Sequence, residues 1–216
     1  FIGNNISFGV REHAMGAILN GMALVNLRPY GSTFLSFSDY IKPAIRMSSL
    51  MNLPVTYIFS HDTINVGADG PTHQPVEQLA MLRSIPNMKV FRPADFKELL
   101  GCWQVILNSN DNPSSLILGR NEVEMHPNTD SKLTTKGGYI YFKEQEELEI
   151  VLIASGSELT YARNIGVHLL DLGYKKFRIV SMPSIEQYLL NSREYKDTVI
   201  PNSVTNIHQT FGYCSN

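Results

Sequence analysis

The stretch VTYIFSHDTINVGADGPTHQP, Val55–Pro75, decides the fold class of this chain. It opens with the apolar, β-branched and aromatic run Val55–Phe59 and passes directly into a polar, glycine-rich segment from Ser60 to Gly70. A short run of this composition is typical of a buried strand. Open α/β sheets place their ligands at the carboxyl ends of such strands. We therefore expect a buried strand that ends in a functional loop.

Alternating strands and helices extend from this stretch in both directions. Short β-branched runs and apolar residues at helical spacing mark the elements, and Asp95 is a residue type that caps helices. The expected elements are a helix over Arg11–Leu24, a helix from Gln74 to Arg83, a strand over Met88–Phe91, a helix from Asp95 to Leu107, a strand over Ser115–Leu118, a strand over Ile150–Ala154, a helix to about Leu172 and a strand over Phe177–Val180. This alternation predicts an α/β protein with a parallel sheet.

A polar segment divides the chain into two such units. From residue 121 to residue 136 no apolar periodicity survives, and Pro, Asn, Thr, Asp and Ser follow one another from Pro127. We predict an α/β domain at residues 1–122, a linker at 123–136 and a smaller α/β domain at 137–216.

The composition excludes several classes of protein. The 216 residues are 43% hydrophobic, which is enough to bury a core. Eighteen Lys and Arg against 20 Asp and Glu give a formal charge of −2, and no basic run is present that could neutralise a nucleic acid backbone. No run approaches the roughly 20 apolar residues that a membrane helix needs. We expect neither a nucleic acid nor a membrane as a partner.

The two cysteines and the N-terminus bear on location. Cys102 and Cys214 form neither a disulfide framework nor a metal-binding pattern, which favours a reducing compartment. The N-terminus lacks the basic-then-apolar layout of a secretory signal. The first residue is Phe1, so we expect the natural start to be missing. These features favour a cytoplasmic location, with a plastid as the alternative if a transit peptide has been lost.

The loop after Val55–Phe59 is the richest candidate site. It carries His61, Asp62, Asp69 and His73, and this density of ionisable groups indicates a polar small-molecule site. The competing interpretation is a solvated turn shaped by the loop's glycines and proline. Metal binding by the two histidines is less favoured, because their spacing is not a helical i, i+4 pair and no third ligand stands out.

Other candidates have ordinary explanations as well. Arg120 follows an apolar run and should emerge at a strand's carboxyl end, where a guanidinium can bind an oxyanion, although it could equally be a surface arginine. Glu12 in a first helical turn is stabilised by the helix dipole. Phe34, Phe37 and Tyr40 recur every three residues, which is typical of a packed helical face.

Several motifs together resemble the transketolase family. They occur in the family's order and extend to about Val204. The motifs are GVREHAMG at Gly9–Gly16, RPYGSTF at Arg28–Phe34, DGPTHQP at Asp69–Pro75, RPAD at Arg92–Asp95, ASGSE at Ala154–Glu158 and VSMPS at Val180–Ser184. The resemblance implies a pyrimidine-binding domain, incomplete at its start, and part of a C-terminal domain, without the diphosphate-binding domain. After Val204 the sequence departs from the family pattern, so we expect a break in the correspondence near Asn206.

The resemblance implies transfer of a two-carbon ketol (glycolaldehyde) unit from a ketose phosphate to an aldose phosphate, a reaction of the pentose phosphate pathway. The cofactor would be thiamine diphosphate. Glu12 would hydrogen-bond a ring nitrogen of its aminopyrimidine, and Phe34, Phe37 and Tyr40 would pack around that ring. His73 would assist proton transfer, which makes Glu12 and His73 the implied catalytic residues.

The substrate and assembly follow from the same resemblance. His61 and Arg120 would hold the substrate's terminal phosphate, and Asp69 and His73 would bind its hydroxyl groups. Mg²⁺ or Ca²⁺ would bind through the absent diphosphate-binding domain, so no metal ligand is expected in this chain. The family's active sites lie at the interface of a homodimer.

Two alternatives remain open. One is another thiamine-diphosphate enzyme, such as the β subunit of a 2-oxoacid dehydrogenase, although the long loop and Arg120 argue against it. The other is an inactive fragment or a non-catalytic binding homologue.

Overall fold

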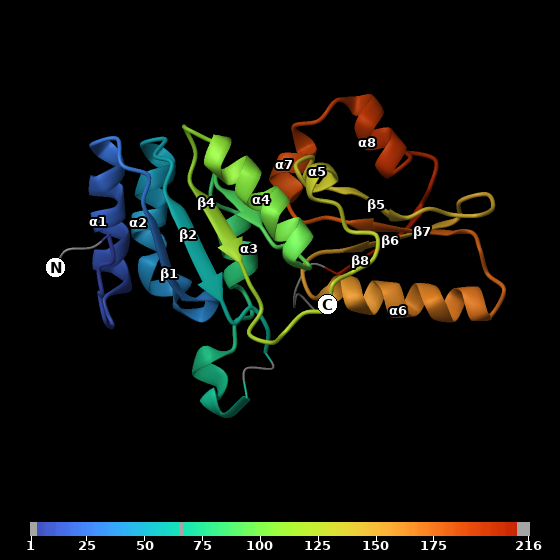
Figure 1. The fold of residues 1–216 in the computed structure, drawn as a ribbon, viewed down its shortest axis with the longest axis horizontal. Coiled ribbons are helices and arrows are strands. Elements are labelled where there is room, and N and C mark those ends of the chain that lie inside the picture. The colour runs from blue at the N-terminus through green and yellow to red at the C-terminus, as the bar shows by residue number, and fades with distance from the viewer. Residues whose placement is uncertain (1–3, 65–66, 211–216) are drawn as a thin grey trace.

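The computed structural model describes residues 4–64 and 67–210 of the chain. Within these residues the chain forms two four-stranded sheets, each with its own helices, and Figure 1 shows them side by side. None of the helices in the described ranges has the length and apolar composition needed to cross a membrane. The α/β fold class expected from the sequence is confirmed.

The first sheet is parallel throughout, with the strand order β1-β2-β4-β3. Its strands are β1 (Tyr30–Phe34), β2 (Thr56–Ser60), β3 (Lys89–Phe91) and β4 (Ser114–Ile117). Its helices are α1 (Glu12–Leu24), α2 (Ser38–Leu50), α3 (Gln78–Arg83) and α4 (Phe96–Asn108), with 3-10 turns η1 (Leu35–Phe37), η2 (Gly67–Asp69) and η3 (Pro71–His73). Because all strands share one direction, their carboxyl ends lie at one edge.

The second sheet is mixed, with the strand order β5-β7-β6-β8. Its strands are β5 (Tyr139–Phe142), β6 (Ile150–Ala154), β7 (Phe177–Ser181) and β8 (Asn206–Thr210), and only β5 is antiparallel to its neighbour. Its helices are α6 (Glu158–Asp171), α7 (Ile185–Leu189) and α8 (Arg193–Val199). One further helical turn, α5 (Ser131–Thr134), lies inside the segment 123–136. The segment near Asn206 forms the edge strand β8, whereas residues 211–216 lie outside the described residues.

Local signals account for several of these elements. The Asp95 carboxylate accepts a hydrogen bond from the backbone N–H of Glu98 (3.0 Å), which confirms the expected cap of α4. The strand β6 has the predicted bounds. The helix expected from Gln74 is wrong at its start, since α3 begins at Gln78. Gln74 has an extended ψ of 106° because the ring of Pro75 disfavours a helical conformation in the residue before it.

The two sheets meet at β3, the edge strand of the first. The backbone N–H of Arg92 donates to the carbonyl of Pro183 (2.8 Å). Nearby, the fully buried Glu98 of α4 accepts hydrogen bonds from Tyr139 (2.8 Å) and Ser181 (2.5 Å) of the second sheet. Burial raises the pKa of the Glu98 carboxyl, and these hydrogen bonds lower it by less. Backbone and side-chain polar bonds therefore join the two units.

Candidate active site

The carboxyl edge of the first sheet gathers three predicted site residues. Phe34 is the last residue of β1 and pairs with Ser60, the last residue of β2. The backbone N–H of Leu118, just after β4, donates to the carbonyl of Phe59 (2.8 Å). Phe34, His61 and Arg120 therefore leave neighbouring strand ends. In Figure 1 this edge faces the loop that carries η2 and η3.

His61 is held in an unusual conformation directly after β2. Its φ of +62° lies in the left-handed region, which is uncommon for a residue with a side chain. Its ring stacks on Phe34 with centroids 3.8 Å apart and an interplanar angle of 26°. Its Nδ1 lies 2.9 Å from the hydroxyl of Ser60. The ring is thus oriented by both neighbours, while the residue remains partly accessible.

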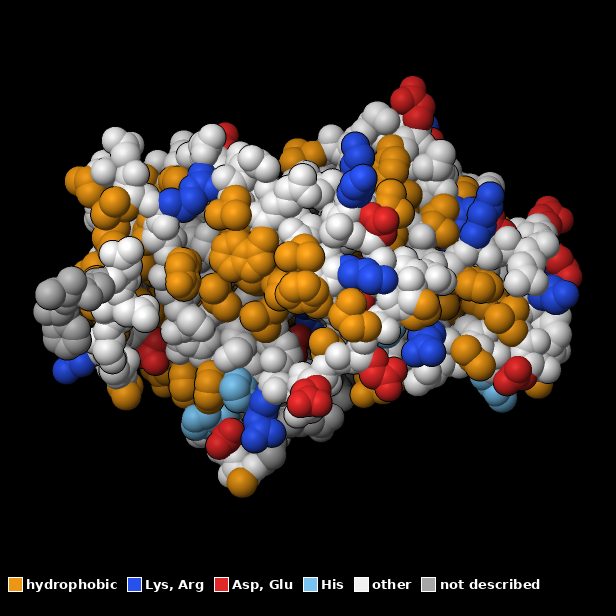
Figure 2. Space-filling model, in the orientation of Figure 1, with side chains coloured by type: hydrophobic (Ala, Val, Ile, Leu, Met, Phe, Trp, Pro, Cys, Tyr) orange, Lys and Arg blue, Asp and Glu red, His pale blue; other side chains and the backbone are white. Residues whose placement is uncertain are grey.

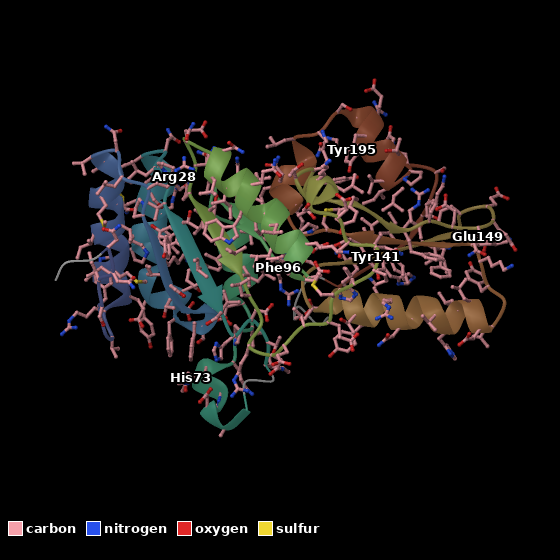
Figure 3. All side chains as sticks on the ribbon, in the orientation of Figure 1. Arg28, His73, Phe96, Tyr141, Glu149 and Tyr195 are labelled. Atoms are coloured by element: carbon pink, nitrogen blue, oxygen red, sulfur yellow. The ribbon has the colours of Figure 1, made fainter. Side chains whose placement is uncertain are left out.

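His73, at the far end of the loop, packs near the same aromatic side chains as His61. It meets Phe37 edge-on at 5.0 Å and Phe34 at 6.0 Å between ring centroids. The side chain of Gln74 donates to the carbonyl of Ile64 (2.7 Å), which ties the two ends of the loop together. Figure 3 shows His73 beyond the carboxyl edge of the sheet. The structure thus brings His61 and His73 around one pair of phenylalanines.

The aromatic residues do not form the packed helical face that their spacing predicts. Phe34 ends a strand, Phe37 ends the 3-10 turn η1, and Tyr40 lies in α2 and is 65% exposed. The buried residues of this turn are Leu35 and Ser36. A 3-10 turn has three residues per turn, so a three-residue spacing keeps the rings on one side. The rings of Phe34 and Phe37 are nearly parallel and stacked, with an interplanar angle of 11°, and Tyr40 extends the row.

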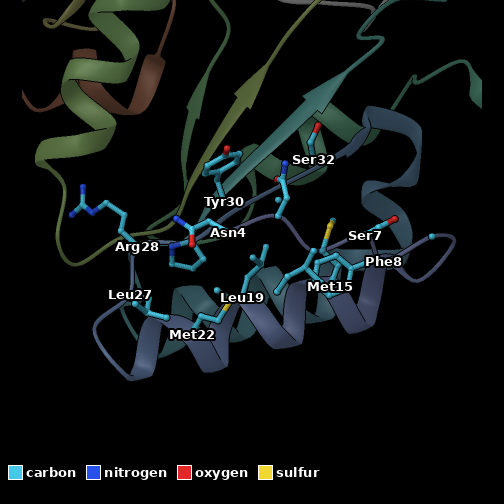
Figure 4. Close-up of a pocket in the computed structure, with 15 residues that line it drawn as sticks. Asn4, Ser7, Phe8, Met15, Leu19, Met22, Leu27, Arg28, Tyr30 and Ser32 are labelled. Carbon is cyan, nitrogen blue, oxygen red and sulfur yellow. The ribbon is translucent and has the colours of Figure 1, made fainter. Parts of the chain in front are cut away.

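Glu12 begins α1 at this same edge. Figure 4 shows Met22, near the end of α1, close to Arg28, which precedes β1. Met15, near the start of α1, lies farther toward the carboxyl end of β1, so α1 runs antiparallel to β1. Glu12 is half-buried, and its carboxylate makes no hydrogen bond or ion pair with any described residue. Its first-turn position, expected from the sequence, is confirmed. The carboxylate is available to a ligand.

Asp69 and Arg120 are exposed parts of the same region. Asp69 ends η2, and Arg120 follows β4 by three residues. Neither side chain makes a hydrogen bond or ion pair within the described residues, so the structure does not join them to the histidines directly. Across residues 4–64 and 67–210, no three His, Cys, Asp or Glu side chains are grouped so that they could hold a metal ion.

A cavity of about 820 Å³ lies apart from these residues. Figure 4 shows it between the segment before α1 and the start of β1, where Phe8, Met15, Leu19 and Tyr30 line it. None of the predicted site residues lines it. It follows the open edge of β1, whose other edge pairs with β2.

A charged cluster behind His61 does not stand out in the sequence. Asp62, Arg92 and Glu158 form buried ion pairs, and we refer to these three residues as the junction cluster. In the sequence, Arg92 and Glu158 are recognisable only as members of family-like motifs, and Asp62 only as a polar loop residue. One sequence feature points to two of them: Asp62 and Arg92 each follow closely after a buried strand, at the edge where ligands bind in parallel sheets.

The comparisons with known proteins agree with this architecture. Residues 2–125 match the family description "Transketolase, pyrimidine binding domain", and residues 137–212 match "Transketolase-like TK C-terminal domain". The chain therefore belongs to the transketolase family.

Individual relatives are similar over almost the whole chain. A probable transketolase of Streptococcus pneumoniae is 47% identical over 204 residues, covering 94% of this chain and 31% of the relative. A transketolase structure from Leishmania mexicana superposes with a TM-score of 0.92 at 39% identity, covering 97% of this chain and 31% of that one. A split-gene transketolase described as an inactive β4 tetramer, at 22% identity and a TM-score of 0.72, shows the fold alone. The chain spans about a third of the length of the curated relatives it matches.

Proposed function

We propose that this chain supplies the pyrimidine-binding and C-terminal parts of a transketolase. Such an enzyme transfers a two-carbon ketol unit from a ketose phosphate to an aldose phosphate with thiamine diphosphate as its cofactor. The observation that carries the proposal is the group formed by Phe34, Phe37, His61 and His73 at the carboxyl edge of the first sheet, within a chain of this family.

The residues fit the aminopyrimidine end of the cofactor. Phe34, Phe37 and Tyr40 present a row of rings against which a planar heterocycle can stack. Glu12 offers a carboxylate with no partner among the described residues, which can share a proton with a ring nitrogen. When bound, the cofactor supplies the electron sink for the two-carbon unit. The protein's part is to orient that ring and to hold the shared proton at Glu12.

The histidines and the two exposed residues suit the substrate. His73 can hydrogen-bond a sugar hydroxyl and move a proton there, and Asp69 can orient a second hydroxyl. His61 and Arg120 leave neighbouring strand ends and can together hold a terminal phosphate. Anchoring the far end of a flexible sugar places its carbonyl end for reaction.

The remaining partners belong to the assembled enzyme. Mg²⁺ or Ca²⁺ would bind through a diphosphate-binding domain, which lies outside the matched residues. A homodimer with the site at its interface is supported by apolar side chains that remain exposed on α1, including Ile18 (45%) and Leu24 (61%). On α4, Phe96 is 58% exposed, and Figure 2 shows hydrophobic side chains gathered over that part of the surface.

The test is an assay of the complete gene product, whose intact mass is measured first against the 24.3 kDa of these 216 residues. With xylulose 5-phosphate and ribose 5-phosphate as substrates, we expect sedoheptulose 7-phosphate to form only when thiamine diphosphate and a divalent cation are present. A 2-oxoacid is offered separately. Decarboxylation of the 2-oxoacid without ketol transfer would instead indicate a 2-oxoacid dehydrogenase component, and no turnover of either substrate would indicate a non-catalytic relative.

A further inference from the structure

The junction cluster links the two sheets directly behind His61. The Arg92 guanidinium donates from Nε to Asp62 Oδ2 (2.8 Å) and from Nη2 to Glu158 Oε1 (2.9 Å), and its Nη1 also pairs with the Glu158 carboxylate. The same Nη1 donates to the carbonyl of Ser155 (2.8 Å). Asp62 belongs to the first sheet's loop, whereas Ser155 and Glu158 belong to the second unit. One side chain therefore joins the two.

This cluster is closed to solvent. The Arg92 side chain is 1% exposed, and those of Asp62 and Glu158 are 2% and 8% exposed. Buried at this depth, a single cation held by two carboxylates has few alternative positions, because each lost contact leaves a charge without solvent or partner. Gly156 closes the cluster from the other side, since a Cβ there would lie 2.8 Å from Arg92 Cγ.

Asp62 of the cluster also lies next to both strand ends that carry the phosphate-binding candidates. Asp62 directly follows His61, whose φ of +62° has to be held in place by its surroundings. The second oxygen, Asp62 Oδ1, lies 3.6 Å from the position of a Cβ on Gly119, the residue before Arg120. Within the described residues, Oδ1 is buried and has no hydrogen-bond partner, so its position depends on Arg92 holding the other oxygen.

We propose that Arg92 is a positioning residue through which the C-terminal unit fixes His61 and Arg120 for binding the substrate's phosphate. The inference rests on the proposed function. Asp62 transmits the position of Arg92 to both strand ends, and Glu158 anchors Arg92 to α6. The C-terminal unit then contributes to phosphate affinity without touching the substrate.

The chain provides a matched control for a merely structural role. Arg178 forms another largely buried pair, with Glu144, in which Nη2 and Oε1 are 2.5 Å apart and the side chains are 6% and 14% exposed. This pair lies wholly within the second unit. Arg92→Lys and Arg178→Lys make the same chemical change at a buried arginine that is paired with a carboxylate, but only Arg92 is also paired with Asp62, the residue after His61.

The test compares Arg92→Lys, Glu158→Gln and Arg178→Lys in the complete gene product. We expect Arg92→Lys and Glu158→Gln to raise KM for xylulose 5-phosphate about tenfold, with kcat and the KM for an unphosphorylated ketose changed by less than about twofold. Arg178→Lys should change neither KM. Equal rises in both KM values, no rise in either, or the same pattern in Arg178→Lys would overturn the inference.

Hydrogen exchange provides a readout that does not depend on turnover. Amide exchange in peptides covering residues 61–64 and 119–121 should be faster in Arg92→Lys and Glu158→Gln than in the wild type, and unchanged in Arg178→Lys. Wild-type protein without ketol transfer would reject the proposed function, and the exchange result would then still decide whether Arg92 holds the two strand ends in place. Unchanged exchange at both strand ends in Arg92→Lys and Glu158→Gln would reject it.

Discussion

Two helices in this chain begin with the same residue in opposite circumstances. Glu12 is the first residue of α1, and Glu158 is the first residue of α6. A glycine in the left-handed region lies shortly before each of them, Gly9 (φ +60°) three residues before Glu12 and Gly156 (φ +61°) two residues before Glu158. Glu158 is 6% exposed and locked to Arg92, whereas Glu12 is half-buried and unpaired among the described residues. The same local signal thus serves a junction in one place and a candidate site in the other.

The contrast extends to the regions around the two helices. At the carboxyl edge of the first sheet, Asp69 and Arg120 are exposed and have no charged partner within the described chain. At the junction, Arg92 is fully buried and saturated with contacts. Substitutions at the junction should therefore act on stability and on the position of the loop, and substitutions at the edge should act on ligand binding with little effect on stability.

The largest effect is expected for Arg92→Met. Removing the guanidinium leaves Asp62 and Glu158 buried without their cation, so we expect a loss of about 3–5 kcal/mol in the free energy of unfolding. Urea denaturation of the purified protein measures it. The matched control is Arg120→Met, which should change stability by less than about 0.5 kcal/mol because Arg120 is exposed. Comparable losses in the two variants would contradict the contrast between the regions.

An intermediate effect is expected for Gly156→Ala. The substitution forces a side chain into the left-handed region and places its Cβ 2.8 Å from Arg92 Cγ. Gly173→Ala imposes a similar strain at φ +78° but has open space around its Cβ. We expect Gly156→Ala to destabilise the protein by at least about 1 kcal/mol more than Gly173→Ala, because only the former displaces a packed neighbour. Thermal unfolding of both variants isolates the effect of this contact, and equal destabilisation would show that Arg92 is not tightly packed there.

The sequence predicts the elements whose signals are local. The helix α4 has a capping carboxylate at Asp95, and β6 is a continuous apolar run. The strand β1 is not predicted because Gly31 and Ser32 interrupt the short run Tyr30–Phe34, and it becomes a strand by pairing with β2. The helix α2 is not predicted either, since it carries Pro43 in its interior. These elements depend on tertiary partners that no short window contains.

The same reasoning separates the candidate site from its support. The polar density of the loop indicates His61 and His73 from the sequence alone, and the family resemblance implies their roles. The junction cluster cannot be predicted in that way, because its contacts join residues 30 and 66 positions apart. Individually, Asp62, Arg92 and Glu158 resemble ordinary surface charges. Only the packing of the two sheets shows that they belong together.

Among the substitutions expected to destabilise the protein, Glu12→Gln should have the smallest effect, and comparing it with Glu158→Gln tests the contrast between edge and junction most directly. A carboxylate in a first helical turn contributes roughly 0.3–1 kcal/mol through the helix dipole, and Glu12 has no described partner to add to this. Glu158→Gln, the same change at the same helical position, removes in addition a charge paired with Arg92, so its loss should be clearly larger. Denaturant unfolding of the two variants side by side measures the difference.

In ketol transfer the order of the two variants should reverse. Glu12→Gln removes the carboxylate proposed to share a proton with the cofactor, so it should lower kcat far more than Glu158→Gln does. If Glu12→Gln lowered the free energy of unfolding as much as Glu158→Gln and left kcat unchanged, Glu12 would be a structural residue. The proposed difference between the sheet edge and the junction would then be contradicted.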